Sequence, residues 1–142
     1  MRLLKKIKVN TYNCEVIFLI TDDMLNSEKY LQKKYGGDPI PGTSADDAEG
    51  LTITISGVLY VVMIDIKYLN HNTIAHELYH LNRRITEDRD ITDEESSAWL
   101  SGFLAEEFYN FLSSKKTKKV FDSLTESNNG GESTKSTEST GS

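Results

Sequence analysis

The sequence predicts an α+β fold in one domain, residues 1–124, followed by a disordered tail, residues 125–142. The whole chain of 142 residues has the length of a single domain. Short segments rich in β-branched and aromatic residues lie before residue 66, and two long segments with helical apolar periodicity follow them. The tail consists of Ser, Thr, Gly, Asn, Glu and Lys, so it has nothing to bury that would offset the entropy of ordering.

Composition and charge exclude several classes of function. The net charge is −6 and the densest basic run is Lys115–Lys119, so a nucleic acid is not an expected partner. The single cysteine, Cys14, rules out an internal disulfide framework, and its place in a predicted strand indicates a buried apolar role. The apolar run Val16–Ile20 is too short for a signal peptide or a membrane span. We therefore expect a soluble, cytoplasmic protein without a membrane partner.

The first predicted strand is Glu15–Ile20, which is rich in β-branched and aromatic residues. One of the polar residues 21–23 caps the helix that follows. That helix runs to about Tyr35 and ends at Gly36-Gly37. Residues 38–50 contain both prolines and several small or acidic residues, which indicates a loop. We expect an exposed connector, and the alternative for a loop of this length is a lid or a rim of the cleft.

Two further strands form a predicted hairpin. Leu51–Ile55 alternates apolar and polar residues, a pattern that is typical of a half-buried strand. Val58–Asp65 is more apolar, and Ser56-Gly57 between the two strands is a two-residue turn signal. The chain then reaches its most informative segment, a predicted helix that begins after Asn70 or Asn72 and runs to residue 84 or 85.

This helix carries the sequence H-E-L-Y-H, residues 76–80, which is an H-E-x-x-H motif. On a helix, His76 and His80 share one face, and each can offer a ring nitrogen to the same Zn²⁺ ion at about 2.0–2.1 Å. Glu77 follows the first histidine and can take a proton from a water molecule held at the metal. The motif therefore supplies two metal ligands and a general base from one helical turn.

An apolar stripe on the same helix supports this interpretation. The stripe lies on the side opposite the two histidines, so the helix is expected to bury its back and to turn the histidine pair toward a cleft. Its members recur at helical spacing: Ile74, Leu78, Leu81 and Ile85. A histidine with a purely structural role in the core would lie within such a stripe, and a chance match to the motif would not require this arrangement.

A second long helix is predicted over Asp93–Ser113, after a polar loop at residues 87–90. Its apolar stripe consists of Leu100, Phe103, Leu104, Phe108 and Phe111. The other side carries the small residues Ala98, Gly102 and Ala105, which would let a neighbouring backbone come close. The short connection forces an antiparallel pair, so we expect the histidine helix to be that neighbour.

A catalytic zinc has three protein ligands and one open position, so a third ligand is needed. His71 lies at the start of the helix and is better explained as a loop or capping residue, and Cys14 is remote in sequence. The acidic cluster Asp93–Glu95 opens the second helix, and the antiparallel return would bring it beside the histidines. Thr92 and Glu95 also form a capping box, which would hold the Glu95 carboxylate against the backbone. Helical geometry leaves Glu94 and Glu95 both open as the third ligand.

Over Val58–Phe111 the chain resembles the gluzincin branch of the zincin metallopeptidases. In that branch H-E-x-x-H supplies two zinc ligands, and a glutamate on a downstream helix, often within E-x-x-A, supplies the third. The segment from Glu95 to Ala98, E-S-S-A, matches this pattern, with fourteen residues between His80 and Glu95. Residue 94 is a glutamate where the branch usually has an asparagine.

The resemblance implies a zincin-like fold with a small mixed sheet, an H-E-x-x-H helix and a glutamate-bearing helix. It implies that Zn²⁺ is the cofactor, held by His76, His80 and Glu95, with Glu77 as the general base. Very small versions that carry a polar tail are typical of phage-encoded peptidases.

We therefore expect a zinc metallopeptidase that hydrolyses peptide or protein substrates through a zinc-activated water. One strand within Tyr60–Asp65 is the predicted sheet edge for an extended peptide. Tyr79, Tyr109 and His71 are the nearest polar candidates for stabilising an oxyanion, although each also has a structural explanation. The alternative function is a catalytically silent, zincin-like zinc-binding protein that recognises a partner. Glu77 favours the enzyme, because a binding protein needs no base at that position.

Overall fold

The computed structural model describes residues 1–36, 48–120 and 122. The chain divides into two compact units, residues 1–108 and residues 109–142. The predicted domain boundary after residue 124, the predicted tail and most of the predicted loop at residues 38–50 lie outside the described residues. Within the described part, no helix has the length and apolar character needed to cross a membrane.

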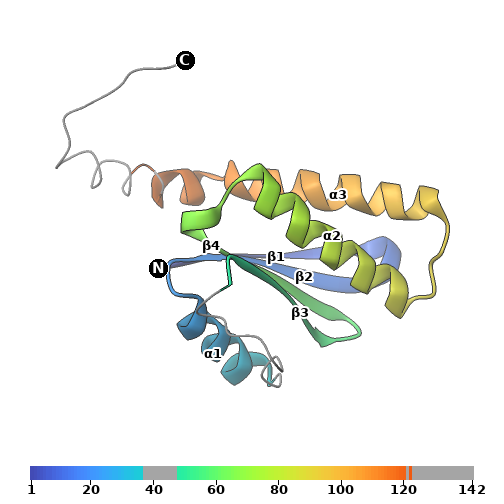
Figure 1. Cartoon of the computed structure of the whole chain (residues 1–142), viewed down its shortest axis with the longest axis horizontal. Helices are drawn as coiled ribbons and strands as arrows, with labels where there is room; N and C mark the ends of the chain where they lie inside the picture. Colours follow the sequence, from blue (N-terminus) through green and yellow to red (C-terminus); the bar gives the residue numbers. More distant parts are fainter. Residues whose placement is uncertain (37–47, 121, 123–142) are drawn as a thin grey trace, which may run out of the picture. The chain divides into compact units, whose positions relative to one another are not determined.

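A four-stranded mixed sheet organises the first unit (Figure 1). Its strands lie in the order β1-β2-β4-β3. Their bounds are Arg2–Val9 for β1, Cys14–Thr21 for β2, Gly50–Ser56 for β3 and Leu59–Asp65 for β4. The pairs β1-β2 and β3-β4 are antiparallel, whereas β2 and β4 are parallel. The predicted α+β class with a small mixed sheet is therefore confirmed.

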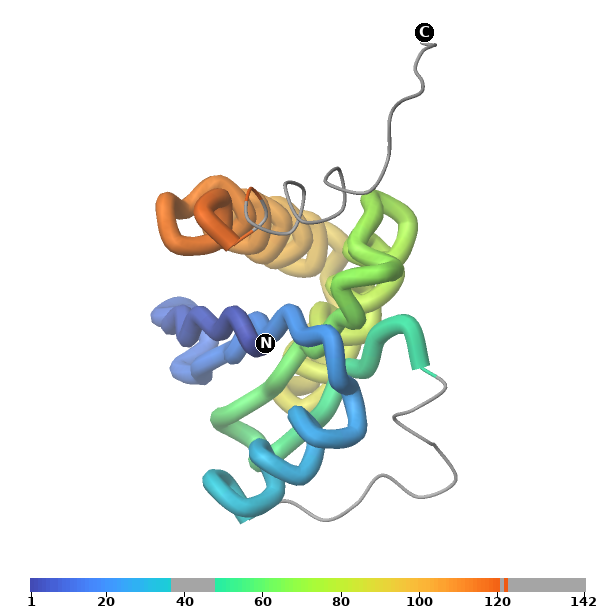
Figure 2. The backbone as a smooth tube through the Cα atoms, turned by 90° about the vertical axis from the view of Figure 1, so that its left-hand side faces the viewer, coloured from blue at the N-terminus to red at the C-terminus, as the bar shows by residue number. Residues whose placement is uncertain are grey.

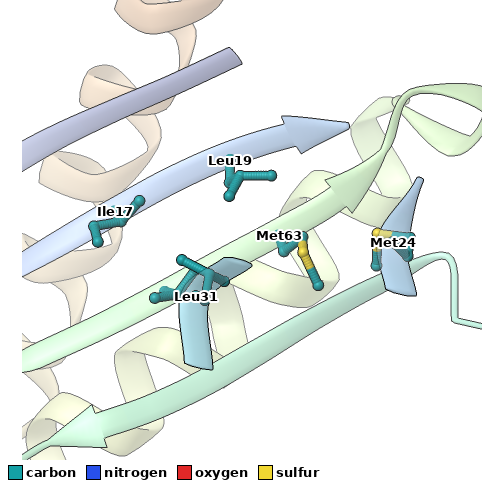
Figure 3. Close-up of a cluster of buried hydrophobic side chains, with 6 residues drawn as sticks. Ile17, Leu19, Met24, Leu31 and Met63 are labelled. Atoms are coloured by element: carbon teal, nitrogen blue, oxygen red, sulfur yellow. The ribbon is translucent and has the colours of Figure 1, made fainter. Parts of the chain in front are cut away.

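Both faces of the sheet are covered, which explains why β2 and β4 are almost continuously apolar. Figure 2 shows α1 on one side of the sheet, and α2 with the first part of α3 on the other. On the α1 side, Ile17 and Leu19 pack with residues of the helix and of β4 in one buried cluster (Figure 3). On the opposite side, the ring of Phe18 meets that of Phe108 edge to face, with 5.0 Å between the centroids.

The strand β1 is absent from the sequence prediction, because its three lysines conceal a buried pattern. Leu3, Ile7 and Val9 are buried, whereas the lysines between them are exposed. β1 forms one border of the sheet and pairs along its whole length with β2. Lysines on such a border discourage pairing with other chains, so here they mark an edge strand.

The helices α1, Met24–Tyr35, and α2, His71–Asp88, begin at capping residues that the sequence identified. The Asp23 carboxylate accepts a hydrogen bond from the Asn26 backbone N–H, and Gly36 ends α1 with a left-handed φ of 75°. Asn70, one of the two predicted candidates, accepts a hydrogen bond from the Thr73 N–H. The predicted polar loop at residues 87–90 is partly wrong, because α2 continues to Asp88.

Asp93 caps the third helix, α3, Glu94–Leu112. Its Oδ2 accepts a hydrogen bond from the Ser96 backbone N–H at 2.9 Å. Hydrogen bonding from the Ser96 side chain, together with this backbone bond, holds the pKa of Asp93 below its ordinary value. The capping box predicted between Thr92 and Glu95 is therefore wrong, because the N-cap is Asp93 and not Thr92. The Glu95 carboxylate is exposed in the first turn and is not the cap.

The packing of α2 confirms one prediction, and that of α3 overturns another. The apolar stripe of α2 is buried, whereas His76 and His80 are exposed as predicted. The small residues of α3 do not receive a helix backbone: Ala98 and Gly102 are exposed, and a Cβ added at Gly102 would meet nothing within 4 Å. The two helices instead meet through Asn82, which hydrogen-bonds Ser97 and Ser101. Within the first unit, α3 contacts the sheet through Phe108, whose ring meets that of Phe18.

The second unit includes the last turn of α3 and a further helical segment, residues 115–120. Ser114 precedes this segment, and its Oγ accepts a hydrogen bond from the Thr117 backbone N–H at 3.3 Å. Ser114 also donates its hydroxyl to Thr117 Oγ1 at 2.9 Å. A serine that accepts from the third residue after it is typical of a helix N-cap.

Candidate metal centre

The two histidines of the motif converge on one point. The Nε2 atoms of His76 and His80 lie 3.1 Å apart, and their rings are nearly perpendicular, with 4.6 Å between the centroids. Two nitrogens bound to a tetrahedral Zn²⁺ at about 2.0–2.1 Å lie roughly 3.3–3.4 Å apart. The pair therefore fits two ligand positions of one zinc ion. The same distance accommodates a hydrogen bond between a protonated and an unprotonated ring nitrogen, which a bound metal would replace.

Glu77 lies between the histidine helix and the sheet. Its side chain is buried, and Oε1 accepts a hydrogen bond from the Thr52 hydroxyl at 2.8 Å. Gly50 lies against the same side chain so closely that a Cβ there would stand 2.9 Å from Glu77 Cγ and 3.2 Å from Oε2. The Thr52 hydroxyl therefore fixes one oxygen of the Glu77 carboxylate, and the Glu77 side chain fits here because residue 50 has no side chain.

A cleft of about 350 Å³ opens at this place. Its lining residues come from the start of β3 and from the first two turns of α2: Glu49, Gly50, Asn72, Thr73, His76 and Glu77. The structure therefore brings the proposed base and one histidine into a common, mostly polar cleft. The second histidine stands one turn further along α2.

The third ligand is not assembled beside this pair. Among residues 1–36, 48–120 and 122, no group of three or more His, Cys, Asp or Glu side chains is arranged to hold a metal ion. Because α2 and α3 run antiparallel and Asn82 contacts Ser97, the residues before Ser97 lie along the last turns of α2, beyond His80. Glu94 and Glu95 belong to that stretch, and both are exposed. Glu95 stays a prediction as the third ligand.

No protein-family model matches the chain, and neither a curated protein nor a solved structure matches it. The case for a function therefore rests on the residues of the cleft and on their surroundings.

The predicted peptide edge is on the wrong strand. β4 lies between β2 and β3, so Tyr60–Asp65 is interior, and β3 forms the border of the sheet. The parallel pairing of β4 with β2 causes the difference, since it brings together segments about forty residues apart, which a local pattern does not reveal. The border strand β3 runs beside α2 and contributes Gly50 to the cleft.

Arg84 is a further residue of this region that the sequence reasoning missed. It follows His76 and His80 at the same four-residue spacing, which places it on their face of α2. Its Nη1 donates a hydrogen bond to the Thr52 carbonyl at 2.8 Å and lies 3.4 Å from Thr54 Oγ1. The sequence does contain a signal for Arg84, because the four-residue spacing of His76 and His80 continues to it.

The other candidate residues are not among those that line the cleft. Cys14 is at the start of β2, beside the start of β4, whereas the cleft is at the end of β4, where Gly50 pairs with Ile64. Burial raises the pKa of the Cys14 thiol, and the Arg89 charge partly opposes that rise. His71 is the first residue of α2, and Tyr79 is 61% exposed. Tyr109 belongs to the second unit.

Proposed function

We propose that the chain is a zinc-dependent metallopeptidase with a zincin-like domain, in which His76 and His80 bind Zn²⁺ and Glu77 is the general base. One observation carries the proposal: the Nε2 atoms of His76 and His80 lie 3.1 Å apart, and the buried Glu77 next to them lines a cleft at the β3 border of the sheet. Glu95 is the proposed third ligand and Glu94 the alternative, and both side chains are exposed and long.

Glu77 is well placed to move a proton. A zinc ion at the pair would supply a Lewis acid that lowers the pKa of a coordinated water to about 7 and polarises the scissile carbonyl. Glu77 accepts the proton of the attacking water and passes it to the leaving amine. The Thr52 hydroxyl holds Oε1, and Gly50 leaves room for Oε2, so one carboxylate oxygen is fixed while the other faces the glycine.

The free edge of β3 offers a place for an extended peptide. The Asp65 N–H donates to the Glu49 carbonyl, so Glu49 and every second residue after it bond to β4. The backbone groups of Gly50, Thr52 and Thr54 consequently point to the outer edge of the sheet, where the Thr52 carbonyl already accepts a hydrogen bond from Arg84. A peptide that adds to this edge passes the cleft at Gly50.

Zinc content and hydrolysis test the proposal together. The purified chain should bind close to one Zn²⁺, and His76→Ala and His80→Ala should each abolish binding, whereas His71→Ala, a histidine outside the pair, should not. Glu77→Gln keeps an oxygen that can accept from Thr52, so folding and zinc content should change little, while peptide hydrolysis should fall by about 10²–10⁴. Full zinc binding without hydrolysis of any peptide in a broad library would favour the catalytically silent zinc-binding protein. A chain that binds no zinc would exclude both.

A further inference from the structure

The N–H groups of Arg84 are only partly used. Nη1 is engaged by Thr52, and across the described part of the chain the Nε and Nη2 groups have no hydrogen-bond or ion-pair partner. The two other arginines of this region differ, because Arg83 is paired with Glu87 and Arg89 uses all three nitrogens on nearby oxygens. The Nε and Nη2 N–H groups point in the same direction and match the two oxygens of a carboxylate.

The position of Arg84 relates it to a peptide on the free edge. It contacts β3 at Thr52 and Thr54, and the cleft lies at Gly50, two residues earlier. One strand residue spans about 3.3 Å, so the guanidinium lies roughly 7 Å further along the edge than the cleft. Residues directly opposite each other in an antiparallel pair place their side chains on the same face. A peptide residue opposite Thr52 therefore turns its side chain toward Arg84.

We propose that Arg84 is a specificity-determining residue that binds the carboxylate of an Asp or Glu side chain two residues from the bond to be cut. This inference rests on the proposed peptidase function and names its substrate class, an extended acidic peptide. The surroundings give no general attraction for anions, since Glu49 and Glu77 line the cleft and the chain carries a net charge of −6. Zinc at the histidine pair would attract any anionic peptide, so the part of the preference that depends on position and on Arg84 is the part that the substitution has to remove.

Peptide binding measures this preference without turnover. The full chain with Glu77→Gln, loaded with zinc, would be titrated by fluorescence anisotropy with paired peptides that carry Glu or Gln at one position of an otherwise constant sequence. The Glu peptide should bind about 10-fold or more tightly than its Gln partner when the residue lies two places from the cleft. Arg84→Gln should remove this difference, because glutamine is polar but carries no charge and lacks the paired N–H groups of the guanidinium.

Arg83→Gln is the matched control. It removes the same charge at the neighbouring residue, whose side chain is in an exposed ion pair with Glu87. It should leave the Glu-to-Gln preference unchanged. The proposal is overturned if Arg84→Gln keeps the preference, if Arg83→Gln loses it equally, or if no peptide binds. Zinc content and hydrolysis by the unsubstituted chain are measured separately. An Arg84-dependent preference in a chain that binds no zinc would keep Arg84 as a binding residue for acidic peptides and would remove the peptidase, and with it the role of Arg84 in substrate specificity.

Discussion

Replacing Gly50 with alanine should displace the proposed general base without touching the histidines. The new Cβ would stand 2.9 Å from Glu77 Cγ, whereas carbon atoms in contact are normally about 3.5–4.0 Å apart. The Glu77 side chain therefore has to retreat by about 0.6 Å or more. Its hydrogen bond to Thr52, now 2.8 Å, would lengthen to a distance at which it contributes little.

The expected magnitude follows from two opposing effects. Overpacking of a well-filled site costs about 1–3 kcal/mol, and replacing glycine in a strand returns about 0.5–1 kcal/mol through the unfolded state. The free energy of unfolding should thus fall by about 1 kcal/mol, within a range of about 0–2.5 kcal/mol. Hydrolysis should fall by about 10²-fold, since a reacting group is misplaced by close to 1 Å. Zinc affinity should stay within about twofold, because the new methyl meets Glu77 and not the ring nitrogens.

Urea unfolding followed by circular dichroism measures the stability loss, and Gly57→Ala is the control, since a Cβ there meets nothing within 4 Å. A double-mutant cycle with Glu77→Ala isolates the contact. Once residue 77 is an alanine, the Gly50→Ala change should cost nothing. The reasoning is refuted if Gly50→Ala is as stable and as active as Gly57→Ala, or if its cost is unchanged in the Glu77→Ala background.

Two further predictions concern the opposite end of the sheet. Arg89→Ala should lower the free energy of unfolding by about 2–3 kcal/mol, because Arg89 donates to the carbonyls of Tyr12 and Gly57 and to the Tyr60 hydroxyl. The control in the same urea titration is Arg83→Ala, at an exposed ion pair, which should change the free energy of unfolding by no more than about 0.5 kcal/mol. Burial and the hydrogen bond to Asp88 raise the pKa of Tyr60 to about 12, so its neutral form stabilises the fold below pH 10 and this stability is lost as pH rises toward 12. Tyr60→Phe should remove that part of the alkaline slope, and an identical slope in both proteins would contradict the assignment.

Local patterns predicted the elements that carry the site. The stripe of α2 and the exposure of His76 and His80 depend on helical periodicity alone, and both agree with the structure. The hairpin of β3 and β4 followed from alternation and from the Ser56-Gly57 turn, and Asn70 was recognisable as a cap. Each of these features is decided within one or two helical turns or strand lengths.

The features that sequence reasoning missed are decided by distant contacts. β1 was hidden by lysines whose exposure depends on its place at the border of the sheet. The extension of α2 to Asp88 involves Tyr60, whose hydroxyl donates to the Asp88 carboxylate. The choice between β3 and β4 as the free edge depends on where β2 pairs. Side chains such as Thr52 and Arg84 acquire a role only after that choice is made.

The parallel pairing of β2 with β4 also bears on the order of folding. The sheet consists of two hairpins, β1-β2 and β3-β4, each closed by a short turn, and this pairing is the one that joins them. Pairings between segments far apart in sequence close slowly, because the loop entropy is lost before the contacts form. The cleft residues, His80 and Arg84 all come from residues 49–84, on one side of this junction. The histidine pair and its proposed base therefore belong to one contiguous piece of chain, the β3-β4 hairpin and α2, and none of them has to be brought in by the long-range pairing.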